Sequence, residues 1–511
     1  MPLDIASPTL CIGIVGTGAM GRGIAQIAAQ AGILVKLHDA LPGAAANARD
    51  TVCATLGKLL EKGKITADAL AAATAKLEVV HNLSALASCQ VVIEAIVENL
   101  DIKRQLFQHL EDIVAADCIL ATNTSSLSVT SIAAACTRPE RVGGFHFFNP
   151  VPLMKIVEVI DGLLTASWVS EALLSLGQRM GHTAVRAKDT PGFIVNHAGR
   201  GFTTEALRIL GEGVAGVQDI DRIMCDAGGF RMGPFELMDL TGLDVSQPVM
   251  ESIYRQFYDE PRFRPSALAA QRLVGGILGR KTGRGFYSYQ NGIADTEPDL
   301  PVPTTLPTTV WVSQAVPAWG ETLRAIVAAT GVEIETGFRP SANALCIVTP
   351  LGSDATTLCM TQGLDATRTV GVDCLFGLTG ETRRRTLMST PVTSTASRQA
   401  THAVLAHDGT PVSLIRDSAG LVAQRIIATI VNIGCDIAQQ RIAKPSDIDR
   451  AVQLGLGYPH GPLALGDVVG ARHILAILEA MQAFYGDPRY RPSPWLKRRA
   501  LLGVSLLSDE E

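Results

Sequence analysis

The sequence predicts an α/β domain built on a mostly parallel sheet, followed by two copies of an all-helical domain. Three observations support this prediction: strands alternate with helices up to residue 188, the pattern after it is mostly helical, and the helical pattern occurs twice. A chain of 511 residues is too long for one ordinary domain, and 47% hydrophobic residues can bury several cores. We place the domain boundaries at 1–188, 189–294, 295–415 and 416–511.

The composition excludes several classes of protein. With 44 basic against 49 acidic side chains, the chain offers no basic surface to a nucleic acid. No stretch approaches the roughly 18 apolar residues that a membrane-spanning helix needs, and the N-terminus carries Asp4 where a signal peptide would be basic. The ten cysteines show no metal-ligand spacing and fit a reducing compartment. We expect a cytoplasmic protein without a metal, a nucleic-acid partner or a membrane contact.

A glycine-rich turn joins the first predicted strand, at 10–15, to the first predicted helix. The turn reads Gly16, Thr17, Gly18, Ala19, Met20, Gly21. In a Rossmann unit the first glycine makes the tight turn, the second lets the backbone approach a pyrophosphate, and the third lets the helix pack on the strand. A second strand at 33–38 follows at the spacing that such a unit requires. The sequence therefore predicts a Rossmann-type dinucleotide site.

Asp39 ends the second predicted strand, 18 residues after Gly21. A carboxylate at this position accepts hydrogen bonds from the ribose hydroxyls of the nucleotide and repels a 2′-phosphate. No arginine follows within nine residues to bind such a phosphate. The sequence thus favours NAD over NADP.

Polar side chains follow three further predicted strands. Glu98, with Lys103 nearby, follows the strand at 90–96, and Asn-Thr-Ser-Ser at 123–126 follows the strand at 118–122. His146 follows the strand at 141–145, and a carboxylate, Glu158, lies 12 residues later in an alternating strand. Open α/β sheets bind ligands at the carboxyl ends of their strands. A histidine paired with a carboxylate is suited to general base catalysis near neutral pH.

Five motifs together resemble the L-3-hydroxyacyl-CoA dehydrogenase family over about 1–290. They are the glycine turn, Glu-Ala-Ile-Val-Glu-Asn at 94–99, Asn-Thr-Ser-Ser-Leu at 123–127, His-Phe-Phe-Asn-Pro at 146–150 and Asp-Thr-Pro-Gly-Phe-Ile-Val-Asn at 189–196. The resemblance implies an NAD-dependent dehydrogenase acting on an acyl-CoA, with His146 as the base and Glu158 as its partner. It also implies that Ser125 and Asn196 surround the reacting oxygen. The cofactor contacts that it implies are Glu98, Lys103, Ser125 and Asn149, and the coenzyme A contacts are Lys62 and Lys64.

The helical domain occurs twice, at an offset of 228 residues. Asp189–Gly192 recurs as Asp417–Gly420, and Asp219–Arg222 recurs as Asp447–Arg450. The run at 257–265 also recurs, at 484–492. Two copies in one chain can pack as two subunits would, so we expect a monomer with an internal pseudo-dimer, or a homodimer.

The second helical copy differs at a predicted site position, because Gln424 stands where the first copy has Asn196. We therefore expect it to have a structural role, bracing the first copy and helping to form the wall of the acyl pocket. The region 308–415 alternates strands and helices but lacks the glycine turn, which suggests a shortened relic of the first domain. Aligning 389–392 with 148–151 places Leu387 at the position of His146.

Two alternative functions were weighed. The 3-hydroxyisobutyrate and 6-phosphogluconate dehydrogenases use a lysine of the helical domain, but this chain has none between Lys188 and Lys281. A non-catalytic NAD-binding protein derived from the family would not need the four polar residues of the predicted site.

The acyl group remains open between two candidates. The length and the run at 257–265 resemble the dehydrogenases of phenylacetate degradation, which act on 3-hydroxyadipyl-CoA, and short-chain 3-hydroxybutyryl-CoA is the alternative. A dicarboxylic acyl chain needs a cation, and the candidates are Arg200, Arg231 and Arg264.

Overall fold

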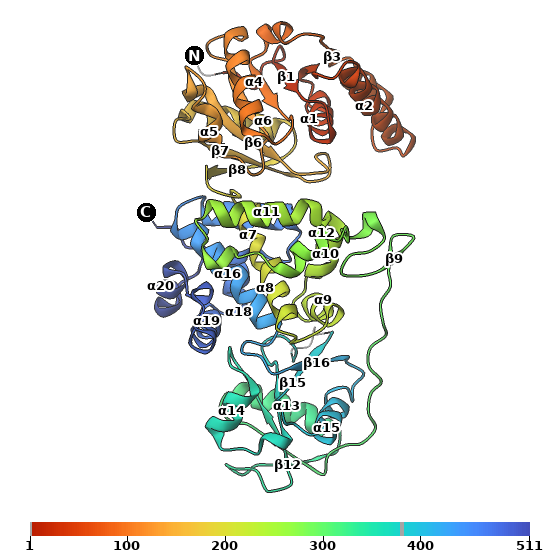
Figure 1. Cartoon of the computed structure of the whole chain (residues 1–511), viewed down its shortest axis with the longest axis vertical. Coiled ribbons are helices and arrows are strands. Elements are labelled where there is room, and N and C mark those ends of the chain that lie inside the picture. Colours follow the sequence, from red (N-terminus) through yellow and green to blue (C-terminus); the bar gives the residue numbers. More distant parts are fainter. Residues whose placement is uncertain (1–2, 379–382, 511) are drawn as a thin grey trace. The chain divides into compact units, whose positions relative to one another are not determined.

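The computed structural model describes residues 3–378 and 383–510. The chain forms two compact units (Figure 1). The first contains Met1–His197 and Gln440–Leu456, and the second contains Ala198–Gln439 and Gly457–Glu511. A short segment that the sequence assigns to the domain at 416–511 therefore belongs to the first unit.

The first unit is built on an eight-stranded sheet with the order β3-β2-β1-β4-β5-β6-β7-β8. Only the β6–β7 pair is antiparallel in this sheet. The strands are β1 (Cys11–Val15), β2 (Leu34–His38), β3 (Leu77–Val79), β4 (Val91–Glu94), β5 (Ile119–Thr122), β6 (Val142–Phe147), β7 (Ile156–Asp161) and β8 (Thr183–Lys188). The strand order reverses between β1 and β4, where doubly wound sheets bind their ligands. This topology confirms the predicted Rossmann-type domain.

Helices cover both faces of this sheet. They are α1 (Ala19–Gln30), α2 (Ala44–Glu61), α3 (Ala67–Thr74), α4 (Leu100–Ile113), α5 (Val129–Ala133), α6 (Ser167–Arg179) and, from the distant segment, α17 (Pro445–Leu456). The apolar side chains of α1 recur with helical spacing and are buried with those of β1, which is why this stretch folds as an amphipathic helix on the sheet. Asn99 caps α4 by accepting hydrogen bonds from the backbone N–H groups of Asp101 and Ile102.

The core of the second unit is α16 (Ala423–Gln439), which is buried along nearly its whole length and packs on α8 (Arg200–Gly211). A Cβ on Gly201 would lie 3.1 Å from the Cα of Ile430, so the two helices approach closely at this glycine. Around them lie α9 (Val217–Asp226), α10 (Pro234–Thr241), α11 (Leu243–Gln256), α12 (Ala267–Val274), α18 (Pro462–Val469), α19 (Ala471–Tyr485) and α20 (Pro494–Leu502).

The repeated run of the two helical copies meets itself in this unit. The 3₁₀ turns Pro261–Phe263 and Pro488–Tyr490 pack together, and Arg262 Nη2 donates to the carbonyl of Arg491 at 2.8 Å. Beside them the buried guanidinium of Arg425, from α16, contacts Glu205 of α8 at 2.7 Å. Removing one partner of a buried ion pair costs about 3–5 kcal/mol. The copies therefore pack on each other as two subunits would, through equivalent surfaces.

The second unit also contains a six-stranded sheet with the order β12-β11-β13-β14-β15-β16, in which only β14 and β15 pair antiparallel. Its strands are β11 (Thr309–Val312), β12 (Glu333–Glu335), β13 (Leu345–Val348), β14 (Thr369–Val372), β15 (Arg385–Ser389) and β16 (Val412–Arg416), and its helices are α13 (Pro317–Ala329), α14 (Ala355–Gln362) and α15 (Thr395–Leu405). A short hairpin of β9 (Tyr289–Gln290) and β10 (Ile293–Ala294) precedes the linker. Across 3–378 and 383–510, no helix is long and apolar enough to cross a membrane.

Candidate active site

His146 and Glu158 form a buried pair on neighbouring strands. Residues of β6 and β7 run antiparallel, and their register places His146 directly opposite Glu158. The imidazole Nδ1 lies 2.7 Å from Glu158 Oε2, and the two side chains are 5% and 0% exposed. The contact predicted from a spacing of 12 residues is therefore present.

A strained turn after β8 holds the carboxylate of this pair. Gly192 has φ 76° and Phe193 has φ 49°, a left-handed conformation that costs a residue with a side chain about 1–2 kcal/mol. The turn directs the backbone N–H groups of Ile194 and Val195 at Glu158 Oε1, each at 2.9 Å. An acceptor for two amides and an imidazole is held as a carboxylate, so Nδ1 of His146 is the donor and Nε2 is left for a substrate.

Three polar residues lie around the histidine. Asn123 accepts a hydrogen bond at 2.9 Å from the backbone N–H of Phe147, which ties the end of β5 to the strand that carries His146. Asn196 donates to the carbonyl of Ser125 at 3.5 Å, so the structure brings these two predicted residues together. Asn149 lies on the exposed turn after β6.

Glu98 and Lys103 organise the serine turn. Glu98 Oε1 accepts hydrogen bonds from Thr124 Oγ1 at 2.6 Å and from the backbone N–H of Ser125 at 3.0 Å. Lys103, 1% exposed, bridges Glu98 at 3.2 Å and Glu94 at 2.5 Å. Burial alone would raise the pKa of Glu98, but Lys103 and the hydrogen bonds lower it below its usual value. The sequence analysis missed Glu94, whose only signal is a carboxylate at the end of a buried strand.

The glycine turn has the geometry of a phosphate-binding loop. Gly16 has φ +94°, and a Cβ there would lie 2.5 Å from the carbonyl of Ala95. A Cβ on Gly21 would lie 1.9 Å from the carbonyl of Gly16, whereas a Cβ on Gly18 would meet nothing within 4 Å. Two glycines therefore permit the close packing and the third leaves space before α1, which starts at Ala19. The first amides of α1 are thus open to an anion.

Asp39 lies at the end of β2 and ties down this turn. Its carboxylate accepts hydrogen bonds from the backbone N–H and Oγ1 of Thr17 at 2.7 and 2.8 Å, and from the N–H of Leu41. Burial opposes ionisation, but these hydrogen bonds lower the pKa of Asp39. The donor set, the open glycine and the ionised acid fit NAD. The remaining predicted contacts, Lys62 and Lys64, are exposed on the turn between α2 and α3.

The second unit has a matching site, and its register corrects one prediction. Val372 pairs with Leu387 across β14 and β15, and the N–H of Asp373 donates to the carbonyl of Thr386 at 3.1 Å. Since β14–β15 is the antiparallel pair of this sheet, as β6–β7 is of the first, Asp373 occupies the histidine position and Thr386 that of Glu158. The prediction that Leu387 stands at the histidine position is wrong, because Leu387 lies on the strand that matches β7.

This matching site is filled by its own side chains. Gln424, the counterpart of Asn196, donates to Asp373 Oδ1 at 3.0 Å and accepts from the N–H of Gly352 at 2.8 Å. A Cβ on Gly352 would lie 2.6 Å from the Cα of Ile477, so α19 occupies the adjoining space. Burial of Asp373 raises the pKa of its carboxyl.

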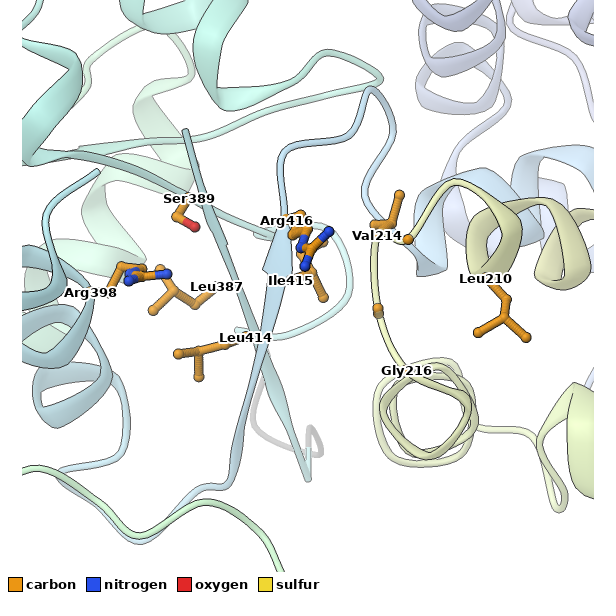
Figure 2. Close-up of a pocket in the computed structure, with 11 residues that line it drawn as sticks. Leu210, Val214, Gly216, Leu387, Ser389, Arg398, Leu414, Ile415 and Arg416 are labelled. Atoms are coloured by element: carbon orange, nitrogen blue, oxygen red, sulfur yellow. The ribbon is translucent and has the colours of Figure 1, made fainter. Parts of the chain in front are cut away.

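The second unit also has a cavity of about 400 Å³ (Figure 2). Residues of β15 and β16 line it together with the turn between α8 and α9 and with Arg398 of α15. None of the predicted site residues contributes to this cavity.

Comparison with known proteins agrees with this geometry. Residues 11–190 match the model of the 3-hydroxyacyl-CoA dehydrogenase NAD-binding domain, and 192–289 and 420–505 match that of the C-terminal domain. The chain belongs to the 3-hydroxyacyl-CoA dehydrogenase family. It is an α/β protein of the NAD-binding Rossmann type with a duplicated helical domain, as predicted.

Relatives exist at two lengths. The 3-hydroxyadipyl-CoA dehydrogenase of Escherichia coli is 37% identical over 96% of this chain and 97% of its own length. A crystal structure titled 3-hydroxybutyryl-CoA dehydrogenase from Escherichia coli K12 superposes with a TM-score of 0.84 at 35% identity, covering 97% of this chain and 98% of that one. A probable 3-hydroxybutyryl-CoA dehydrogenase of Deinococcus radiodurans is 41% identical and matches over 99% of its length, but over only 54% of this chain.

Proposed function

We propose that the protein oxidises an L-3-hydroxyacyl-CoA to the 3-oxoacyl-CoA with NAD. The observation that supports this most is the buried His146–Glu158 pair, held in the same sheet as a glycine turn that fits a dinucleotide. Membership of the 3-hydroxyacyl-CoA dehydrogenase family gives the reaction class.

His146 acts as the general base in this proposal. Its Nε2 takes the proton of the substrate hydroxyl while Glu158 accepts the hydrogen bond from Nδ1 and stabilises the imidazolium that forms. The two backbone amides of the strained turn keep Glu158 in place. Ser125 and Asn196 orient the hydroxyl and then the new carbonyl oxygen.

NAD would be held by the turn from Gly16 to Gly21, by Asp39 and by the serine turn that Glu98 anchors, with Asn149 beside it. When bound, it supplies the hydride acceptor. Lys103 supports this contact surface from within, through Glu98, and Lys62 and Lys64 are the proposed contacts for the phosphates of coenzyme A.

The test is NADH formation with a panel of 3-hydroxyacyl-CoA esters from C4 upwards, including 3-hydroxyadipyl-CoA. We expect turnover of at least one ester with NAD, and much weaker turnover with NADP. Purified protein that binds NAD but oxidises none of these esters would favour the non-catalytic alternative.

For the acyl group we propose 3-hydroxyadipyl-CoA, with 3-hydroxybutyryl-CoA as the second candidate, because relatives of full length carry both names. The three candidate arginines differ in setting: Arg231 is exposed, Arg264 lies 3.8 Å from Asp487, and burial lowers the pKa of Arg200 to about 10. Replacing each in turn with Met identifies the one whose loss raises KM for the dicarboxylic ester but not for the C4 ester.

We further propose that each chain has one active site and that 295–415 is a shortened, non-catalytic counterpart of the domain at 1–188. The filled site around Asp373 supports this, as does the absence of a glycine turn after β11. We also infer a reducing, cytoplasmic location, since the ten cysteines all lie within the described residues and none forms a disulfide.

A further inference from the structure

The second helical copy contributes a helix to the unit that contains His146. Helix α17 packs on β7 and β8, and the carbonyl of Ile442, just before it, accepts a hydrogen bond from the N–H of Lys188 at 2.9 Å. The same contact recurs in the second unit, where the N–H of Arg416 donates to the carbonyl of Val214 at 2.9 Å and α9 packs on β16. Each α/β sheet is therefore covered by a helix of the helical copy that is more distant in the sequence.

Near its C-terminal end, α17 approaches the strained turn that holds Glu158. A Cβ on Gly455 would lie 2.9 Å from Cγ1 and 3.0 Å from Cγ2 of Val195, a separation that side chains do not tolerate. Val195 is 1% exposed and β-branched, so it has little freedom to turn away. Only glycine fits at this position while Val195 keeps its place.

Val195 also provides one of the two backbone N–H groups that hold Glu158 Oε1. A displacement of Val195 would therefore be transmitted to Glu158 and from there to His146, which are 2.7 Å apart. We propose that Gly455 is a positioning residue: through Val195, the second helical copy sets the geometry of the His146–Glu158 pair. This inference rests on the proposed function and adds to it a residue from the far end of the chain.

The matching positions of the second unit support this coupling. At the offset of 228 residues, Gly455 corresponds to Ala227 and Val195 corresponds to Ala423. Where the helix carries a methyl group, the turn has a smaller side chain, and where the turn has valine, the helix has no side chain. The total volume is thus balanced between the two positions, as expected for close-packed neighbours.

The experiment is a double-mutant cycle with Gly455→Ala, Val195→Ala and the double variant, which recreates the alanine pair of the second unit. Gly57→Ala on α2 is the control, because a Cβ at Gly57 meets nothing within 4 Å and the change in helix propensity is the same. The assay measures kcat, KM for NAD and thermal unfolding with the best ester of the panel.

We expect Gly455→Ala to lower kcat about tenfold or more while KM for NAD changes less than twofold. Gly57→Ala should keep the kcat of the unmodified enzyme, and the double variant should recover most of the loss because Val195→Ala removes both clashing methyl groups. A kcat of Gly455→Ala within twofold of Gly57→Ala, or losses that simply multiply in the double variant, would overturn the inference and leave the proposed function intact.

A second readout does not require turnover. The low-field proton resonance of the His146 Nδ1–H, assigned by its loss in His146→Gln, reports the hydrogen bond to Glu158. It should shift in Gly455→Ala and return in the double variant. An unchanged resonance in Gly455→Ala rejects the coupling even if no ester is oxidised, whereas an inactive enzyme with a shifted resonance rejects the proposed function alone.

Discussion

The same strand pair carries opposite chemistry in the two units. On β6 and β7 a histidine meets a carboxylate that three donors hold, and on β14 and β15 the matching places hold Asp373 and Thr386. The first arrangement leaves an imidazole nitrogen for a substrate. In the second, Gln424 takes up the carboxyl group and α19 occupies the adjoining space. The fold is therefore sufficient for the scaffold, but a few side chains decide whether a site is open.

The largest expected effect is on the rate, from His146→Gln. Loss of a general base lowers kcat by about 10²–10⁴-fold, while NAD affinity should stay within a few-fold because the glycine turn is unchanged. Steady-state kinetics and NAD titration measure both quantities. The matched change in the second unit, Asp373→Asn, should leave kcat unaltered, and a comparable loss there would contradict the assignment of one active site per chain.

Glu158→Gln should have the next largest effect. A hydrogen bond to a charged group is worth about 1.5–3 kcal/mol and each 1.4 kcal/mol is a factor of ten, so we expect kcat to fall about 10- to 100-fold. The counterpart Thr386→Val should keep kcat and leave the unfolding free energy unchanged or higher, because Thr386 Oγ1 is buried without a hydrogen-bond partner among the described residues. Destabilisation by Thr386→Val would show that the second site depends on this hydroxyl.

Asp39→Ser tests the nucleotide turn, which only the first unit has. The change removes a negative charge and weakens the tie to Thr17, which now spans 2.7 and 2.8 Å. We expect weaker NAD binding and a preference for NAD over NADP that is narrower by about tenfold, the value of one charge-assisted hydrogen bond. The ratio of kcat/KM for the two cofactors measures the effect, and an unchanged ratio would place the selectivity elsewhere.

The smallest effect concerns the pH dependence of stability. Burial raises the pKa of Asp373 in the folded state above that of the unfolded chain, so the folded state binds more protons and stability falls as pH rises above about 4. The slope is at most about 1.4 kcal/mol per pH unit. Asp373→Asn should remove this fall. Urea unfolding at pH 4.5, 6 and 8 measures it, and parallel curves for both proteins would contradict the prediction.

Short-range patterns carried most of the information about the first site. The glycine turn, Asp39 at the end of β2 and the histidine–carboxylate spacing all depend on neighbouring residues of one βαβ unit, so alternation and turn chemistry predict them. Glu98 and Lys103 were predicted as cofactor contacts, but the structure shows them in an inner role, as anchors of the serine turn. The sequence had no signal for this, because an ion pair with Glu94 depends on the depth of burial.

The sequence by itself determined the Rossmann-type domain, the composition of the His146 site and the duplication of the helical domain, because periodicity, glycine spacing and repeats are local properties of a chain. Only the tertiary structure decided that Asp373, and not Leu387, matches the histidine, since that depends on strand pairing. Only the structure could also show that Gly455 contacts Val195, 260 residues earlier in the chain. Contacts between such distant segments arise from the complementarity of whole surfaces, which no local pattern encodes.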